Sequence, residues 1–146
     1  MRVPPPLIFA AFLGAVVLLQ RLLPLPAPPH DLVRLSATAC ALVAALLGFG
    51  SLGLFLAARE NPIPETATRR LVLRGPYRFS RNPMYLGMLL LYLAGGLWWA
   101  CLWALVLAPF VVWVVTAWVI RLEERYLEST FGDEYRAYCA RVRRWL

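Results

Sequence analysis

Four long apolar runs divide the chain, and they limit the folds that it can adopt. They extend over about Leu7–Leu23, Leu32–Ala58, Pro83–Leu97 and Ala100–Ile120. A helix of roughly 20 apolar residues crosses the hydrocarbon core of a bilayer. We therefore predict an all-α integral membrane protein with about four transmembrane helices, the last two forming a helical hairpin.

The overall composition supports a membrane location. Of the 146 residues, 61% are hydrophobic and 16% are charged, whereas about 25% of the residues in a soluble domain are charged. We expect one membrane domain over residues 1–146. Its predicted parts are two N-terminal helices within 1–58, a cytoplasmic loop at 59–82, and a hairpin with a C-terminal tail at 83–146.

The 15 basic residues are all arginines, and their positions predict the orientation in the membrane. Six lie within Arg59–Arg81 and six within Arg121–Arg144, each group beside an apolar run. Cytoplasmic segments next to membrane helices carry an excess of basic residues. We therefore expect both termini on the cytoplasmic side of the inner membrane, and we do not expect nucleic acid as a partner.

The polar segment after the fourth run, "RLEERYLESTFGDEYRAYCARVRRWL", predicts amphipathic cytoplasmic helices with a break near Gly132. Three separated cysteines and a single histidine form no recognisable ligand cluster, so no metal site is predicted. The oligomeric state is left open, because the glycine-rich stretch Gly48–Gly53 could pack within one subunit or between subunits.

The first candidate site lies where the third apolar run begins. Asn82 is a favoured helix cap and Pro83 suits the first helical position, and a helix start beside Arg81 could bind an anion. Tyr85 and Gly87 follow; a glycine there would let a ligand approach the backbone. The alternatives are a capped helix whose arginines contact lipid phosphates, with Gly87 serving helix packing and Tyr85 lying in an interfacial aromatic belt.

The second candidate site is the pair Glu123 and Glu124, where the fourth run ends. An antiparallel hairpin brings this pair to the same membrane face as residues 82–87. Carboxylates near hydrocarbon are costly unless they are paired. They either pair with the neighbouring Arg121 and Arg125 as a solvated helix end, or they meet a polar or cationic group held against the hairpin.

Together, the two segments resemble the isoprenylcysteine carboxyl methyltransferases and the related membrane phospholipid methyltransferases. That family has an RHPxYxG segment, a hydrophobic hairpin, a Glu-Glu pair and an FGxxYxxYxxxV tail. Here the pattern is carried by Arg81, Asn82, Pro83, Tyr85, Gly87, Glu123, Glu124, Phe131, Gly132, Tyr135, Tyr138 and Val142. Asn82 replaces the usual histidine, and Arg143 stands where the family often has a proline.

The resemblance implies methyl transfer from S-adenosylmethionine to a lipophilic acceptor that enters from the bilayer. It implies a cofactor site at the cytoplasmic face, with Tyr138 and Arg141 as further supports. Arg121 is a candidate anchor for an anionic group of the acceptor. If the acceptor is an amine, Glu123, Glu124 or a tyrosine could accept its proton, and Glu124 is the preferred candidate. The implied cofactor-binding residues are Arg81, Asn82, Pro83, Tyr85, Gly87, Glu123, Glu124 and Tyr135.

Two other functions are considered. One is a membrane reductase that uses NADPH, because related membrane reductases share parts of this C-terminal architecture. The other is a non-enzymatic membrane scaffold, for which both motifs would only be topology signals. A carboxylate, an amine and a thiol all remain open as the methyl acceptor.

Overall fold

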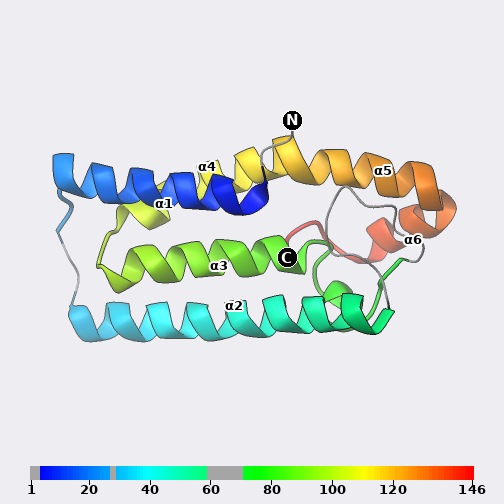
Figure 1. Cartoon of the computed structure of the whole chain (residues 1–146), viewed down its shortest axis with the longest axis horizontal. Coiled ribbons are helices and arrows are strands. Elements are labelled where there is room, and N and C mark those ends of the chain that lie inside the picture. The colour runs from blue at the N-terminus through cyan, green and yellow to red at the C-terminus, as the bar shows by residue number, and fades with distance from the viewer. Residues whose placement is uncertain (1–3, 27–28, 59–70) are drawn as a thin grey trace.

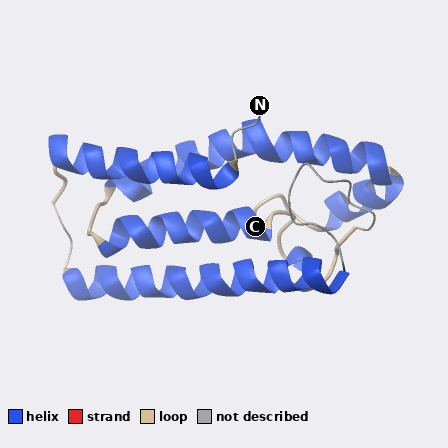
Figure 2. Cartoon of the chain, in the orientation of Figure 1, coloured by secondary structure: helices blue, strands red, loops and turns tan. Residues whose placement is uncertain are grey.

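A computed structural model of the protein describes residues 4–26, 29–58 and 71–146. In these segments all regular structure is helical, which confirms the predicted all-α class (Figure 2). In chain order the elements are α1 (Pro5–Leu22), α2 (His30–Ala58), the short 3₁₀ turn η1 (Gly75–Arg78), α3 (Pro83–Trp98), α4 (Trp103–Val115), the π-helical turn η2 (Thr116–Ile120), α5 (Arg121–Phe131) and α6 (Asp133–Arg141).

The first four helices lie side by side along the long axis of the molecule (Figure 1). Helix α3 contacts α1, α2 and α4. Helix α4 continues through η2 into α5, so that Trp103–Phe131 forms a single helical stretch of 29 residues. The turn between α3 and α4 lies at one end of the bundle, and α5 and α6 lie at the other (Figure 1).

Within the described residues, three helices are long and apolar enough to cross a membrane: Pro5–Leu22, His30–Leu54 and Trp103–Phe131. The predicted count of four spans is not confirmed, because α3 has only 16 residues. At 1.5 Å per residue it is about 24 Å long, shorter than a hydrocarbon core of about 30 Å.

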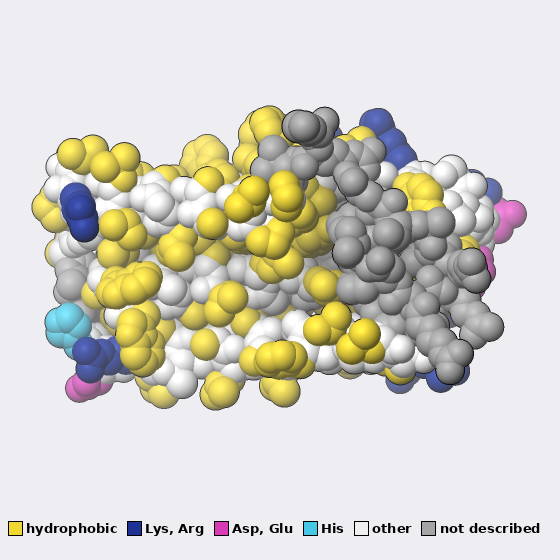
Figure 3. Space-filling view, viewed as in Figure 1, with side chains coloured by type: hydrophobic (Ala, Val, Ile, Leu, Met, Phe, Trp, Pro, Cys, Tyr) yellow, Lys and Arg dark blue, Asp and Glu magenta, His cyan; other side chains and the backbone are white. Residues whose placement is uncertain are grey.

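Large apolar side chains cover the outside of the bundle. On α2, Leu46 is 73% exposed and Phe49 is 75% exposed. Figure 3 shows apolar side chains along the length of one face, with charged side chains gathered toward its two ends. This distribution suits a protein that is surrounded by lipid between two aqueous ends.

The interior is packed mainly between α1, α3 and the α4–η2 helix. Val16, Val111, Val115 and Ile120 are fully buried. The hairpin turn is tight, because a side chain at Gly96 would overlap the methyl group of Ala104 on the next helix. This close approach sets the distance between α3 and α4.

Two predictions about chain breaks have different outcomes. The predicted break near Gly132 is confirmed, since α5 ends at Phe131, α6 begins at Asp133 and Gly132 has φ +52°. The predicted loop 59–82 lies partly outside the described residues, which resume at residue 71 and then form η1. The predicted cytoplasmic position of both termini also stays a prediction, and residues 1–3 lie outside the described part.

Candidate functional site

Helix α3 begins at the predicted place, with Pro83 in its first position. The predicted cap by the Asn82 side chain is wrong. Instead, Asn82 Nδ2 donates a hydrogen bond to the Arg144 carbonyl (3.0 Å), and the Asn82 backbone N–H donates to Ser80 Oγ (3.1 Å). The C-terminal tail lies beside the helix start, and its carbonyl binds the Asn82 amide nitrogen, while the Asn82 side chain makes no cap hydrogen bond.

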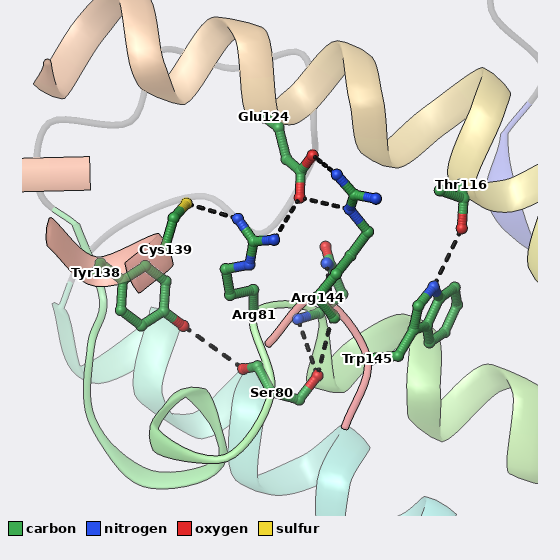
Figure 4. Close-up of polar contacts among 9 residues, drawn as sticks. Ser80, Arg81, Thr116, Glu124, Tyr138, Cys139, Arg144 and Trp145 are labelled. Carbon is green, nitrogen blue, oxygen red and sulfur yellow. Dashed lines mark hydrogen bonds and ion pairs between the residues drawn. The ribbon is translucent and has the colours of Figure 1, made fainter. Parts of the chain in front are cut away.

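The two sequence motifs meet through Arg81 and Glu124 (Figure 4). Arg81 Nη2 lies 3.4 Å from Glu124 Oε1, and the two side chains are 14% and 16% exposed. Arg144 binds the same carboxylate at both oxygens, from Nε to Oε1 (2.9 Å) and from Nη2 to Oε2 (2.8 Å). One carboxylate, mostly removed from solvent, is thus shared by two guanidinium groups from distant parts of the chain.

This geometry corrects the alternative in which Glu124 pairs with its neighbours on the helix. Arg121 and Arg125 are both exposed. The ion pairs that the structure describes for Glu124 are with Arg81 and Arg144. The partners of Glu124 are therefore residues that the fold of the hairpin and tail brings close to it, and not the arginines next to it on the same helix.

The remaining donors of Arg81 distinguish it from a simple ion-pair residue. Nη1 donates to Cys139 Sγ on α6. Nε is buried and has no hydrogen-bond partner among the described residues. A buried donor without a partner is costly, so Arg81 retains capacity to bind an additional acceptor group.

Glu123 has different neighbours from Glu124. Tyr85, which is buried on α3, donates its hydroxyl hydrogen bond to Glu123 Oε1 (2.8 Å). Tyr77 of η1 also lies near, and its pKa is raised by burial, then by the charges of Tyr138 and Glu123. The two adjacent glutamates therefore face two different surroundings, phenols for Glu123 and guanidinium groups for Glu124.

Gly87 lies against α2. A Cβ atom at this position would lie 3.3 Å from the Ala44 carbonyl oxygen and 3.5 Å from Leu47 Cβ. This close contact supports the packing role that the sequence left open for Gly87. Pro83, four residues earlier, is fully buried, and the cofactor roles of both residues stay predictions.

The two tyrosines of α6 are buried, and one of them contacts the segment that precedes α3. Tyr135 and Tyr138 are buried, with ring centroids 6.2 Å apart. The Tyr138 hydroxyl donates to the Tyr77 carbonyl (2.7 Å), and burial raises its pKa to about 12. Burial likewise raises the pKa of Tyr135. Both phenols are therefore neutral hydrogen-bond donors at physiological pH.

The structure brings most of the predicted residues together but separates two of them. Arg81, Asn82, Tyr85, Glu123 and Glu124 form one connected region with the α6 tyrosines. By contrast, Arg121 and Arg141 are exposed, and none of the described ion pairs includes either of them.

Several residues of the site were not predicted from the sequence, and two of them lie in the C-terminal segment that follows α6. Arg144 binds Glu124, and Trp145 Nε1 donates to Thr116 Oγ1 (3.1 Å). Cys139 accepts from Arg81, and Ser80 accepts from Asn82. The signals for the tail were its composition, two adjacent arginines and a tryptophan in "RVRRWL", and the family pattern that reaches Val142.

Comparison with known proteins identifies a family whose model matches this chain. The model of a family described as phospholipid methyltransferase matches residues 34–134, which include both motifs. An uncharacterized protein of Haemophilus influenzae is 48% identical over 63 residues, which is 43% of this chain and the whole of that protein. No solved structure matches.

Proposed function

Because the chain belongs to the phospholipid methyltransferase family, we propose that it transfers a methyl group from S-adenosylmethionine to a lipophilic acceptor in the membrane. Membership implies methyltransferase activity on membrane lipid substrates. The observation that carries the finer proposal is the contact between Arg81 and Glu124, which joins the two motifs at one end of the bundle.

The chemistry of the residues fits S-adenosylmethionine. The buried Nε of Arg81, which has no partner among the described residues, suits the cofactor carboxylate. The carboxylates of Glu123 and Glu124 suit its ammonium group or ribose hydroxyls. When bound, the cofactor supplies a methyl group already activated on a sulfonium.

The protein's part in this reaction is mainly to bind and orient the two reactants. Asn82, Pro83, Tyr85, Gly87 and Tyr135 would line the cofactor site. Tyr85 would hold Glu123 in place through the hydrogen bond described above. No nucleophilic side chain is needed, because the acceptor itself attacks the methyl group.

The acceptor is proposed to reach the site from the bilayer. Arg121 is exposed at the end of the π-helical turn, where its charge could attract an anionic group of the acceptor. If the acceptor is an amine, Glu124 is the proposed proton acceptor; a carboxylate or thiolate needs none. The two arginine-rich segments support placing this end at the cytoplasmic face of an inner membrane.

Ligand titration of the purified protein in detergent tests the proposal. S-adenosylmethionine and its demethylated product should bind, and NADPH should not. Arg81→Ala should weaken binding about tenfold or more, since charged hydrogen bonds contribute about 1.5–3 kcal/mol. Arg125→Ala is the matched control, because Arg125 is exposed at the same end. Binding of NADPH alone would instead indicate the reductase, and binding of neither ligand would indicate a scaffold.

A further inference from the structure

The last five residues, Val142–Leu146, form a segment that we call the C-terminal clasp. Its backbone lies against the start of α3: the Arg81 N–H donates to the Arg143 carbonyl (3.0 Å), and Asn82 Nδ2 donates to the Arg144 carbonyl (3.0 Å). Ser80 Oγ also lies 3.4 Å from the Arg144 carbonyl. Three consecutive residues before α3 thus hold one extended segment.

Two side chains of the clasp reach the other half of the hairpin (Figure 4). Arg144 forms two hydrogen bonds with Glu124 at the start of α5. Trp145 Nε1 donates to Thr116 in the π-helical turn (3.1 Å). The clasp therefore connects α3 to the α4–α5 helix at the end of the hairpin opposite its tight turn.

The distances show that Arg144, rather than Arg81, fixes the orientation of the Glu124 carboxylate. Arg144 makes two short contacts with the carboxylate, whereas Arg81 makes one at 3.4 Å. A bidentate guanidinium–carboxylate contact defines the orientation of both groups. The hydrogen bonds to Glu124 also raise the pKa of Arg144.

From this geometry we propose that Arg144 is a positioning residue for the cofactor site, and the proposal rests on the proposed function. Arg144 orients the Glu124 carboxylate and holds the clasp across the start of α3, so that the Nε of Arg81, which has no partner among the described residues, stays available to the ligand. Arg144 itself needs no contact with the cofactor. The family match ends at residue 134, so this role falls on a part of the chain beyond the matched region.

The test compares Arg144→Gln with Arg143→Gln. Both variants remove one positive charge from adjacent positions, but the Arg143 side chain is exposed, and among the described residues its carbonyl alone takes part in the clasp contacts. Hydrogen–deuterium exchange of the ligand-free protein is measured for the peptide containing the Arg81 amide. Exchange should be about tenfold faster in Arg144→Gln and within about twofold of the wild type in Arg143→Gln, because loss of a charged bidentate contact releases the clasp.

Affinity for S-adenosylmethionine is the second readout. It should fall about tenfold or more in Arg144→Gln, recover in part in Arg144→Lys, which keeps the charge without the bidentate geometry, and stay unchanged in Arg143→Gln. A folded Arg144→Gln protein with wild-type exchange or wild-type affinity would overturn the proposal.

A milder variant covers the case in which Arg144→Gln does not fold. Trp145→Phe keeps the aromatic ring but loses the hydrogen bond to Thr116, and it should increase Arg81 amide exchange about threefold; no increase would overturn the clasp. If the wild-type protein binds no S-adenosylmethionine, the proposed function fails. The ligand-free exchange measurement would still decide separately whether Arg144 holds the clasp.

Discussion

Gly95 and Gly96 are adjacent in α3, and the structure predicts opposite responses to alanine at the two positions. A Cβ at Gly95 would make ordinary contacts of 3.6 Å with the flexible end of Leu13. A Cβ at Gly96 would overlap the Cβ of Ala104, which is itself fully buried on the neighbouring helix. The first change can be accommodated, whereas the second requires the backbones of α3 and α4 to move apart.

The expected magnitudes follow from two opposing terms. Alanine is favoured over glycine in a helix interior by about 1 kcal/mol, whereas overpacking a tight interior costs about 1–3 kcal/mol. We place Gly96→Ala near the upper end of that cost, because the opposing atom is a methyl group fixed to backbone. Gly96→Ala should therefore lower the free energy of unfolding by roughly 2 kcal/mol, and Gly95→Ala should raise it by up to about 1 kcal/mol.

Thermal unfolding of the detergent-solubilised protein, followed by fluorescence size-exclusion chromatography, measures the difference. For a chain of this size, 1 kcal/mol corresponds to about 2–4 °C in Tm, so the Gly96→Ala protein should melt roughly 4–8 °C lower. Adding Ala104→Gly removes the opposing methyl group and should recover part of the loss. Equal Tm values for Gly95→Ala and Gly96→Ala would refute the packing of the hairpin described here.

Three further predictions concern the site and the tail. Tyr85→Phe removes a hydrogen bond to the Glu123 carboxylate and should lower the free energy of unfolding by about 1.5–3 kcal/mol in chemical denaturation; a neutral effect would mean that the bond is not formed. Burial raises the pKa of Tyr138 from its usual value near 10 to about 12, so its contribution to stability is present below pH 10 and is lost as the pH rises through 12. Tyr138→Phe should therefore show a shallower fall in Tm over that pH range, and an unchanged slope would contradict it. Gly132 has φ +52°, so Gly132→Ala should lower the free energy of unfolding in chemical denaturation by about 1–2 kcal/mol; a rise of up to about 1 kcal/mol, as expected for an ordinary helical glycine, would contradict this backbone conformation.

Much of the helical arrangement could be predicted because each part depends on a local pattern. Long apolar runs predict the helices, the Asn82-Pro83 pair predicts the start of α3, and a glycine between polar stretches predicts the break at Gly132. The approach of Arg81 to Glu124 follows from the antiparallel hairpin. These features can be predicted from local sequence patterns and from the single turn between α3 and α4.

The clasp could not be predicted in the same way. Its contacts with the start of α3 join residues more than 60 positions apart, such as Asn82 with Arg144. Its contacts with Glu124 and Thr116 span 20 and 29 positions, and no periodic pattern marks the five residues that make them. The side chain of Asn82 was expected to cap α3, but its amide nitrogen donates to a distant carbonyl and the side chain makes no cap hydrogen bond. The length of α3, by contrast, was visible in the sequence, since the run Pro83–Leu97 is about as short as the 16-residue helix, and both are shorter than the roughly 20 residues that usually cross a bilayer.

The most direct measurement of the central claim is transfer of a labelled methyl group. Purified protein, reconstituted into membranes extracted from cells, is incubated with methyl-labelled S-adenosylmethionine, and lipids and proteins are then extracted separately. The account predicts label in a lipophilic acceptor with the wild-type protein and with Arg125→Ala, and little label with Arg81→Ala or Glu124→Ala. Label-free extracts from a folded wild-type protein that binds S-adenosylmethionine, or undiminished transfer by both site variants, would contradict it.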